Sequence, residues 1–169
     1  DGLNIQKTLG DKYQVPVGVE NDGQAAALCE HWLGELHDVN TGAIMTLGTG
    51  VGGGILIDNR VLHGHHFQAG ELSWMITNQH HGVKNMAAYT GHSCSAVNMI
   101  KAINLSLKNL NLTDGRAAFA AIKAGNPIAI KIFKHFCLNV AVLILNIQSV
   151  IDGSKIVIGG GVSSQPILI

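Results

Sequence analysis

The sequence has 169 residues, of which 47% are hydrophobic and only 13% are charged, and its eleven basic residues balance its eleven acidic ones. A chain this apolar buries a core, which excludes an intrinsically disordered protein, and its length suits one domain or one lobe of a larger protein. The neutral balance, without a basic cluster, gives no electrostatic footprint for nucleic acid or for an anionic membrane. We therefore expect small molecules or other protein chains as partners.

The three cysteines, Cys29, Cys94 and Cys137, are far apart and never form a C-x-x-C pair. This spacing favours buried, reduced thiols over a disulfide framework. No charged segment followed by an apolar core opens the chain, so no secretory signal is visible. The most apolar stretch, residues 136–151, contains polar side chains and falls short of the roughly 20 residues of a membrane span. These features predict a cytoplasmic protein.

The first predicted elements are a strand and a helix. Residues 13–22 alternate apolar side chains behind a proline, which is typical of a strand that ends at Glu20 or Asn21. Residues 22–36 are rich in Ala, Leu and Glu and begin with Asp22, a favoured N-cap residue, which predicts a helix.

Two apolar runs flank the glycine-rich stretch LGTGVGGG at residues 47–54. The runs predict a meander of short strands over residues 41–64, with a second turn at Asp58 and Asn59. Residues 71–82 follow no regular period.

The second half of the chain is predicted to be mainly helical. Residues 85–107 alternate helical stretches, with a break at Thr90 and Gly91, and a further helix lies between Asp114 and Gly125.

The longest predicted helix begins after Asn126, has Pro127 in its first turn, and runs to about Val150. Its apolar residues recur at steps of three and four, which indicates one continuous buried face. These residues are Ile130, Phe133, Phe136, Cys137, Val140, Leu143, Ile144 and Ile147.

The glycines at positions 48, 50, 52, 53 and 54 are the first candidate site. Glycine lets successive backbone amides turn toward one point, and phosphate is the common anion at such a nest. No lysine follows in the position that a P-loop requires. A tight hairpin with bulges explains the same composition, so both interpretations stay open.

Asn21 and Asp22 are the second candidate site, because ligands bind at the ends of strands in α/β sheets. An Asp there can accept a proton from a substrate hydroxyl, and an Asn can exchange hydrogen bonds with sugar oxygens. Asp22 as a helix N-cap would instead stabilise the helix by about 1 kcal/mol. Both roles remain open for Asp22.

The third candidate site is the end of the chain. Residues 154–164 predict a short strand followed at once by Gly159, Gly160 and Gly161. This turn admits the close approach of a planar or phosphorylated ligand, and a simple turn between strand and helix explains it equally well.

Taken together and in this order, E-N-D-x-x-x-A-A, L-G-T-G-x-G-G-G and I-G-G-G-V-S resemble motifs of the ROK family of sugar kinases and related repressors. The resemblance runs from about residue 13 to 164. It implies an α/β lobe of the actin-like, hexokinase-like ATPases, which are ribonuclease H-like, with a mixed sheet and flanking helices. Residues 1–22 would then end the N-terminal lobe and form a hinge, and residues 23–169 would be the C-terminal ROK lobe.

The resemblance assigns the sugar side of the site. Asp22 matches the catalytic base that takes the proton from the sugar hydroxyl, Asn21 matches its sugar-binding neighbour, and Glu71 matches a Glu that hydrogen-bonds the sugar. Many family members have Gly-His where this chain has Ser73 and Trp74. Trp74 is expected to stack on a sugar ring or to fill the vacated space.

The resemblance also assigns the nucleotide side. Gly48, Thr49 and Gly50 match the loop that contacts the phosphates of ATP, and Gly160 and Gly161 match the turn beside the adenosine. ATP and Mg²⁺ are therefore the expected cofactors, and a homodimer is the expected assembly.

The resemblance implies no zinc site in this chain. The family's zinc-binding imidazole is missing, and residues 78–91 contain none of the cysteines that supply the other ligands. His80 and His81 would face apart on a strand and are not expected to replace them. The histidine run at residues 63–66 is expected to be a solvated loop.

The implied function is ATP-dependent phosphorylation of a hexose or hexose derivative, such as glucose, an amino sugar or a β-glucoside. The family's D-x-G-G-T motif is absent from the sequence, so we expect a truncated chain that is inactive alone. The alternatives are a sugar-sensing transcriptional regulator, whose helix-turn-helix would lie outside these residues, and an inactive fragment of a kinase. The retained Asp22 favours the kinase, because a sensor needs no base.

Overall fold

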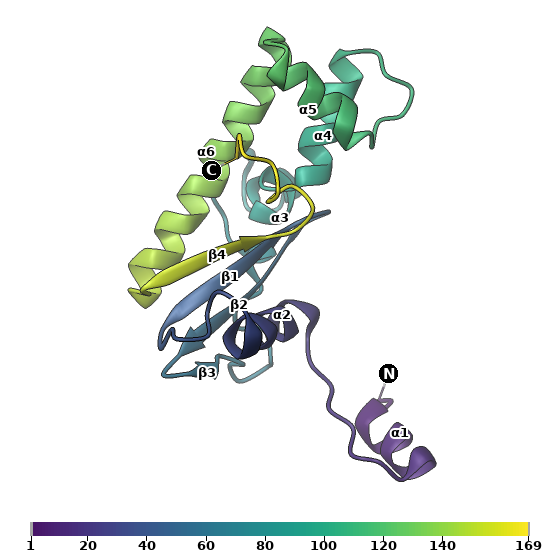
Figure 1. Cartoon of the computed structure of the whole chain (residues 1–169), viewed down its shortest axis with the longest axis vertical. Helices are drawn as coiled ribbons and strands as arrows, with labels where there is room; N and C mark the ends of the chain where they lie inside the picture. Colours follow the sequence, from purple (N-terminus) through teal and green to yellow (C-terminus); the bar gives the residue numbers. More distant parts are fainter. Residues whose placement is uncertain (1, 169) are drawn as a thin grey trace.

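A four-stranded mixed sheet in the order β3-β2-β1-β4 forms the centre of the computed structural model, which describes residues 2–168 apart from the side chain of His81 (Figure 1). The strands are β1 (Gly42–Leu47), β2 (Val51–Ile57), β3 (Arg60–Val61) and β4 (Lys155–Gly159). β1 pairs antiparallel with β2 and parallel with β4, and β2 pairs antiparallel with β3. The predicted mixed sheet is confirmed. Positions 1 and 169, which bound the two predicted domain ranges, lie outside the described residues.

Both predicted turns of the meander are present. The amide of Gly48 donates to the carbonyl of Gly50 at 3.0 Å and closes the turn between β1 and β2. Asp58 and Asn59, with φ of 50° and 61°, connect β2 to β3. Two central residues with positive φ match the right-handed twist of the paired strands, which explains the tight connection.

Helices cover both faces of the sheet (Figure 1). One face carries α2 (Asp22–Leu33), and the other carries α3 (Thr90–Ser93), α4 (Ala96–Ser106), α5 (Gly115–Lys123) and α6 (Pro127–Ile151). Side chains of β1 alternate between the two faces: Met45 and Leu47 belong to the larger core cluster and Ile44 to the smaller one beneath α2. β1 is therefore buried on both sides.

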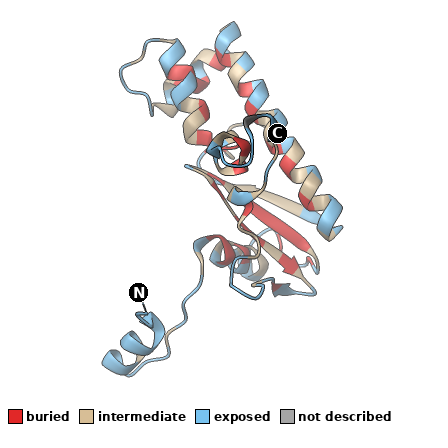
Figure 2. Ribbon diagram, turned by 180° about the vertical axis from the view of Figure 1, so that it is seen from behind, coloured by how far each residue is buried: buried red, intermediate tan, exposed pale blue. Residues whose placement is uncertain are grey.

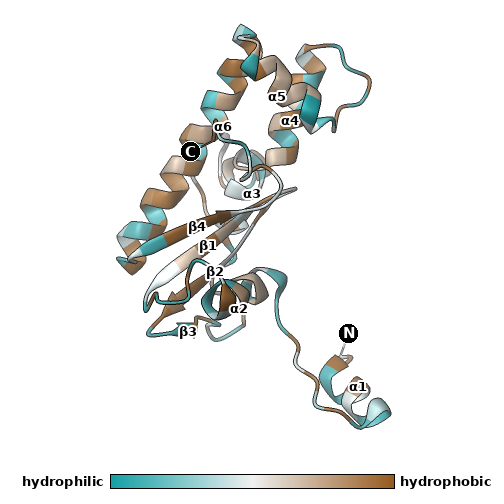
Figure 3. Cartoon of the chain, viewed as in Figure 1, coloured by the Kyte–Doolittle hydropathy of each residue, from teal (hydrophilic) through white to brown (hydrophobic). Residues whose placement is uncertain are grey.

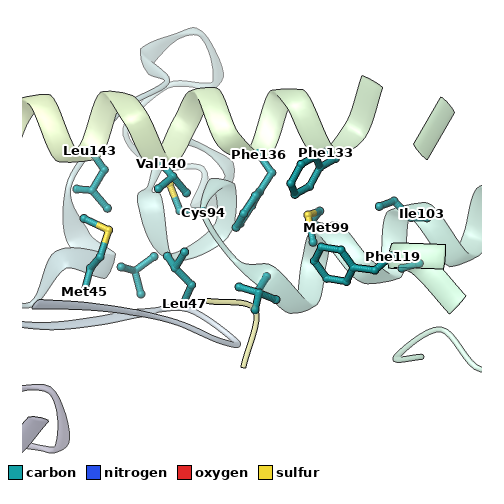
Figure 4. Packing of buried hydrophobic residues seen from close by; sticks show 14 of the residues in the cluster. Met45, Leu47, Cys94, Met99, Ile103, Phe119, Phe133, Phe136, Val140 and Leu143 are labelled. Atoms are coloured by element: carbon teal, nitrogen blue, oxygen red, sulfur yellow. The ribbon is translucent and has the colours of Figure 1, made fainter. Parts of the chain in front are cut away.

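α6 is the main core helix, and its predicted bounds and buried face are confirmed. Asn126 caps it by accepting from the amides of Ile128 and Ala129. Among the described helices, α6 is the one long and apolar enough to cross a membrane. One face of this apolar helix (Figure 3) packs against the sheet, α4 and α5 (Figure 4), whereas Leu138, Leu145 and Val150 are exposed. Its buried residues are Ala129, Phe133, Phe136, Val140, Leu143 and Ile147.

The strand predicted over residues 13–22 is wrong. A helix that the sequence analysis missed, α1 (Ile5–Tyr13), comes first, and the residues after it are extended without pairing to any strand. Val15 and Val19, whose alternation predicted the strand, are 52% and 58% exposed. α1 has no buried residue and projects away from the sheet (Figures 1 and 2). Alternation alone therefore marked an extended segment that has no neighbouring strand.

Residues 71–93 form short helical turns; the predicted lack of regular period covered residues 71–82, and helical stretches were predicted from residue 85. The turns before α3 are η1 (Leu72–Trp74), η2 (Gln79–His81) and η3 (Met86–Ala88). His80 and His81 lie in η2 and not on the predicted strand, because the Asn78 side chain accepts from the amide of His80 and starts a turn. Thr90 and Gly91, predicted as a helix break, begin α3 instead.

The start of α2 lies against β2 at backbone distance. A Cβ on Gly23 would lie 2.4 Å from the carbonyl oxygen and 2.6 Å from the amide nitrogen of Gly53. A Cβ on Gly54 would in turn lie 2.5 Å from the Cβ of Ala27. Glycine is required at these contacts because no side chain fits between the helix and the strand.

Replacing Gly23 with Ala should destabilise the fold. The added Cβ meets backbone atoms that belong to the sheet, so α2 must move, at a cost of about 1–3 kcal/mol in the free energy of unfolding. Urea unfolding followed by circular dichroism measures this change. The matched control is Gly18→Ala, because no atom lies within 4 Å of the added Cβ there. Equal stability of the two variants would contradict the described packing.

Candidate active site

Asn21 is the N-cap of α2, which corrects the prediction that Asp22 caps this helix. The Asn21 side-chain oxygen accepts from the amides of Gly23 at 2.8 Å and Gln24 at 3.1 Å. The Asn21 side-chain nitrogen donates to Glu71 Oε1 at 2.8 Å, across 50 residues of sequence. Asn21 has the extended conformation that a cap needs, which leaves Asp22 as the first helical residue.

Asp22 is exposed at the same end of α2. Its Oδ1 accepts from the amide of Gly23 at 2.9 Å. Its Oδ2 accepts no hydrogen bond from any residue that the structure describes. One carboxylate oxygen thus helps to fix the side chain, and the other can accept a proton or a hydrogen bond from a ligand.

The segment that carries Glu71 is held against α2 and β2. Gln24 Nε2 donates to the carbonyl of Ala69 at 3.0 Å. Gly70, with φ of 83°, lies so close to β2 that a Cβ would be 3.2 Å from the Cα of Gly54. Gln24 is 1% exposed, and its Oε1 has no partner among the described residues. The sequence analysis missed Gln24, because nothing in a helical Gln indicates that it holds a loop 45 residues away.

Trp74 lies on the surface beyond Glu71. Its side chain is 63% exposed and contacts the ring of Tyr89 edge to face, with ring centroids 5.8 Å apart. Most of the indole therefore remains free for stacking and does not fill an internal space.

The predicted phosphate loop is fixed to the start of α4. The carbonyl of Gly48 accepts from the amide of Val97 at 3.2 Å and from the Ser95 hydroxyl at 3.3 Å. Thr49 is exposed at the tip, and its hydroxyl makes no hydrogen bond within the described part of the chain. No described atom lies within 4 Å of the Cβ position of Gly48, so this glycine presents an open backbone.

A cavity of about 730 Å³ lies next to this loop. It is formed by the end of β1, the start of α4, the length of α5 and the turn after β4. Its lining residues are Leu47, Gly48, Ala96, Val97, Ile100, Thr113, Asp114, Gly115, Arg116, Phe119, Ala120, Lys123, Gly161, Val162 and Gln165.

The structure brings together only part of the predicted nucleotide side. Gly48 and Gly161 line the cavity, whereas Thr49, Gly50 and Gly160 are not among its lining residues. Gly160 is instead required by packing, because its φ is 98° and a Cβ would lie 2.3 Å from the carbonyl oxygen of Leu47. The cavity-lining residues of α4 and α5 could not be identified from the sequence, because their apolar spacing is the same as that of a helix that faces the core.

Asp22 does not line this cavity, so the two parts of the candidate site are separate within the chain. Gly53, beside the start of α2, is three residues along the chain from Gly50, a distance of about 10 Å in an extended strand. The glycine-rich start of β2 therefore separates the carboxylate cluster from the cavity.

The described residues do not form a magnesium site by themselves. Apart from positions 1, 169 and the His81 side chain, no three His, Cys, Asp or Glu residues lie close enough to hold a metal ion together. Asp114 lines the cavity, but its Oδ1 caps α5 by accepting from the amide of Ala117 at 2.9 Å. Proteins often bind Mg²⁺ with only one or two carboxylates, together with waters and the oxygens of the substrate phosphates.

The sequence profile of the ROK family matches residues 1–169. This chain belongs to the ROK family. A β-glucoside kinase from Listeria innocua is 30% identical to it over an alignment of 171 positions. The alignment covers all of this chain and 58% of the relative.

Two solved ROK structures share the fold. A ROK family protein from Streptococcus pneumoniae, in complex with sucrose, has a TM-score of 0.84 at 28% identity over 99% of this chain and 55% of its own. A ROK glucokinase from Streptomyces griseus, in complex with glucose and AMPPNP, has a TM-score of 0.77 at 25% identity. The match covers 97% of this chain and 58% of the glucokinase chain. The α/β lobe is thus hexokinase-like, and the chain spans little more than half the length of these relatives.

The solvated loop predicted for residues 63–66 is confirmed except at His63. His65 and His66 are exposed as expected, but His63 Nε2 lies 2.7 Å from Glu20 Oε2. Glu20 Oε1 accepts from the amide of Asn21 at 3.0 Å. The hydrogen bond from His63 lowers the pKa of the Glu20 carboxyl, and burial opposes this shift.

Replacing Glu20 with Gln should reduce stability in a pH-dependent way. Because folding lowers the pKa of Glu20 from its ordinary value of 4.5, the ionised carboxylate adds stability above that pH. This stability is lost as the pH falls through the lower folded pKa. Urea unfolding from pH 3 to pH 6 should therefore show Glu20→Gln and wild type converging toward pH 3.

The control is the same comparison in a His63→Ala background, where the main cause of the lowered pKa is gone. There the two proteins should differ little at any pH. A stability difference that stays constant from pH 3 to pH 6 in the wild-type background would contradict this account.

Proposed function

We propose that this ROK chain is one lobe of a kinase that transfers the γ-phosphoryl group of ATP to a hydroxyl of a hexose or hexose derivative. The observation that supports the proposal is the 2.8 Å hydrogen bond between Glu71 and Asn21, which is next along the chain to Asp22, whose Oδ2 is available to a ligand. The relatives support it, since they include a β-glucoside kinase and a glucokinase solved with glucose and AMPPNP.

The sugar would bind where α2 begins. Asn21 and Glu71 each keep hydrogen-bonding capacity beyond their mutual contact, and neighbouring sugar hydroxyls need both donors and acceptors. The exposed indole of Trp74 would cover an apolar face of the ring. Which hexose binds depends on residues that contact its other side, and the named relatives point to glucose or a β-glucoside as the first ligands to test.

Asp22 would act as the general base. As the sugar hydroxyl oxygen forms a bond to the γ-phosphorus, its proton passes to Asp22 Oδ2, and the bond between the γ-phosphorus and the bridging oxygen of ADP breaks. Phosphoryl transfer depends mainly on positioning and charge neutralisation, so a correctly placed carboxylate suffices. A bound Mg²⁺ would neutralise phosphate charge.

The adenosine part of ATP would occupy the cavity beside Gly161. Ile100, Phe119 and Val162 give the cavity an apolar lining that suits a planar base. Arg116 and Lys123 lie two turns apart along α5 and add positive charge to the lining, which favours an anionic ligand. The triphosphate would run from this cavity past Gly48 toward Asp22, along the glycine-rich start of β2.

The lobe division, the assembly and the compartment belong to the same proposal. Residues 1–22 would end the first lobe and form the hinge, and the chain alone would be inactive because catalysis needs the part of the relatives outside the match. The three cysteines, Cys29, Cys94 and Cys137, are free thiols, which suits a reducing cytoplasm, but Cys29 is exposed and not buried as predicted. Burial raises the pKa of Cys94 to about 11, so this thiol is unreactive. We expect a homodimer.

Replacing Asp22 with Asn should abolish phosphoryl transfer and leave sugar binding nearly unchanged. Loss of a general base lowers kcat by about 10²–10⁴-fold, while the similar shape of Asn preserves the local contacts. Transfer from ATP is measured with the full-length gene product on glucose, amino sugars and β-glucosides, and sugar affinity by calorimetry. The control is Asp38→Asn, whose side chain is 98% exposed. Wild-type turnover by Asp22→Asn would remove Asp22 from this role.

A further inference from the structure

The hydroxyl of Ser73 joins the segment that carries Glu71 to the glycine hairpin. Ser73 Oγ accepts from the amide of Val51 at 2.9 Å and donates to the carbonyl of the same residue at 3.0 Å. Val51 is 1% exposed and directly follows Gly50. One hydroxyl therefore satisfies both backbone groups of a buried residue at the base of the hairpin.

The surrounding backbone leaves room for this one side chain. A Cβ on Gly50 would lie 3.0 Å from Ser73 Oγ, and a Cβ on Gly91 would lie 2.9 Å from the same atom. Two glycines from different segments thus border the hydroxyl. This packing explains why Gly50 is a glycine without reference to a ligand.

Ser73 also lies between the two parts of the candidate site. Glu71, two residues before it, bonds to Asn21 on the sugar side. Gly48 and Gly50, on the hairpin, lead to the nucleotide cavity. The Ser73 hydroxyl therefore connects the hairpin directly to the segment that carries Glu71.

We propose that Ser73 is a positioning residue that couples sugar binding to nucleotide binding, because it fixes the Glu71 segment to the glycine hairpin. This inference rests on the proposed kinase function. A ligand that orders the hairpin then orders Glu71 as well, so the second ligand binds to a site already arranged. The coupling is reciprocal, as thermodynamic linkage requires.

Removing the hydroxyl should break the coupling without unfolding the segment. Other contacts hold it in place: Thr90 Oγ1 donates to the carbonyl of Leu72, and the Leu72 side chain packs on Gly53. In Ser73→Ala the two backbone groups of Val51 lose their partner, and the hairpin can move independently of Glu71.

The experiment compares sugar affinity with and without AMPPNP by calorimetry, using the full-length gene product and the sugar that it phosphorylates best. Wild type should bind sugar at least about fivefold more tightly in the presence of AMPPNP. Ser73→Ala should lose most of this gain, while its sugar affinity without AMPPNP changes by less than about threefold. Ser73→Cys, which keeps a donor and acceptor at this position but forms weaker hydrogen bonds, should show an intermediate gain in sugar affinity.

Thr77→Ala is the matched control. It removes a half-buried hydroxyl from the same irregular segment, where Thr77 contacts Ser93 and not the hairpin. It should keep the wild-type gain. The coupling role is overturned if AMPPNP raises the sugar affinity of Ser73→Ala as much as that of wild type. It is also overturned if AMPPNP does not raise the sugar affinity of wild type. If wild type binds neither sugar nor AMPPNP, the proposed function fails and this inference fails with it. If Ser73→Ala does not fold, Ser73→Cys replaces it. A Ser73→Cys variant whose sugar affinity rises with AMPPNP as much as that of wild type then overturns the inference.

Discussion

The contact on which the site depends is the approach of backbone to backbone between the start of α2 and β2. Gly23 touches Gly53, and Gly70 touches Gly54, so a helix, a strand and a loop meet with no side chain between them. Interiors packed this closely tolerate little displacement. These contacts fix the positions of Asn21 and Glu71, because Asn21 accepts a hydrogen bond from the amide of Gly23 and Glu71 directly follows Gly70.

The same strand explains why the chain presents two ligand regions and not one. Its middle, at Gly53 and Gly54, lies beside the start of α2, where the carboxylate and amide side chains suit a sugar, and its start at the hairpin leads to an apolar cavity that suits a nucleoside. The two regions have different chemistry because different residues reach them: Asn21 and Glu71 in one, and α4 and α5 in the other. A phosphoryl donor that extends along the strand would join them.

Sequence patterns predicted the elements that have a strong period of their own. The face of α6 and the strands around the glycines followed from spacing, and the starts of α5 and α6 from Asp114 and Asn126. Local patterns did not settle contacts made across the chain. They could not show that residues 13–22 lack a partner strand, or that Asn21 and not Asp22 caps α2. Glycines 50, 53 and 54 looked like a loop built for an anion, but in the fold each lies against other protein atoms where a Cβ would be crowded. Gly48, by contrast, has no described atom within 4 Å of its Cβ position.

The central claim is that Asn21 and Glu71 bind one sugar as a unit. A double-mutant cycle with Asn21→Ala, Glu71→Ala and the double variant, measured as sugar affinity by calorimetry, tests it directly. If the two side chains act together, the losses of binding free energy are non-additive by about 1 kcal/mol or more, because either change removes the arrangement that both provide. Losses that add within about 0.5 kcal/mol would show two independent residues and contradict the account.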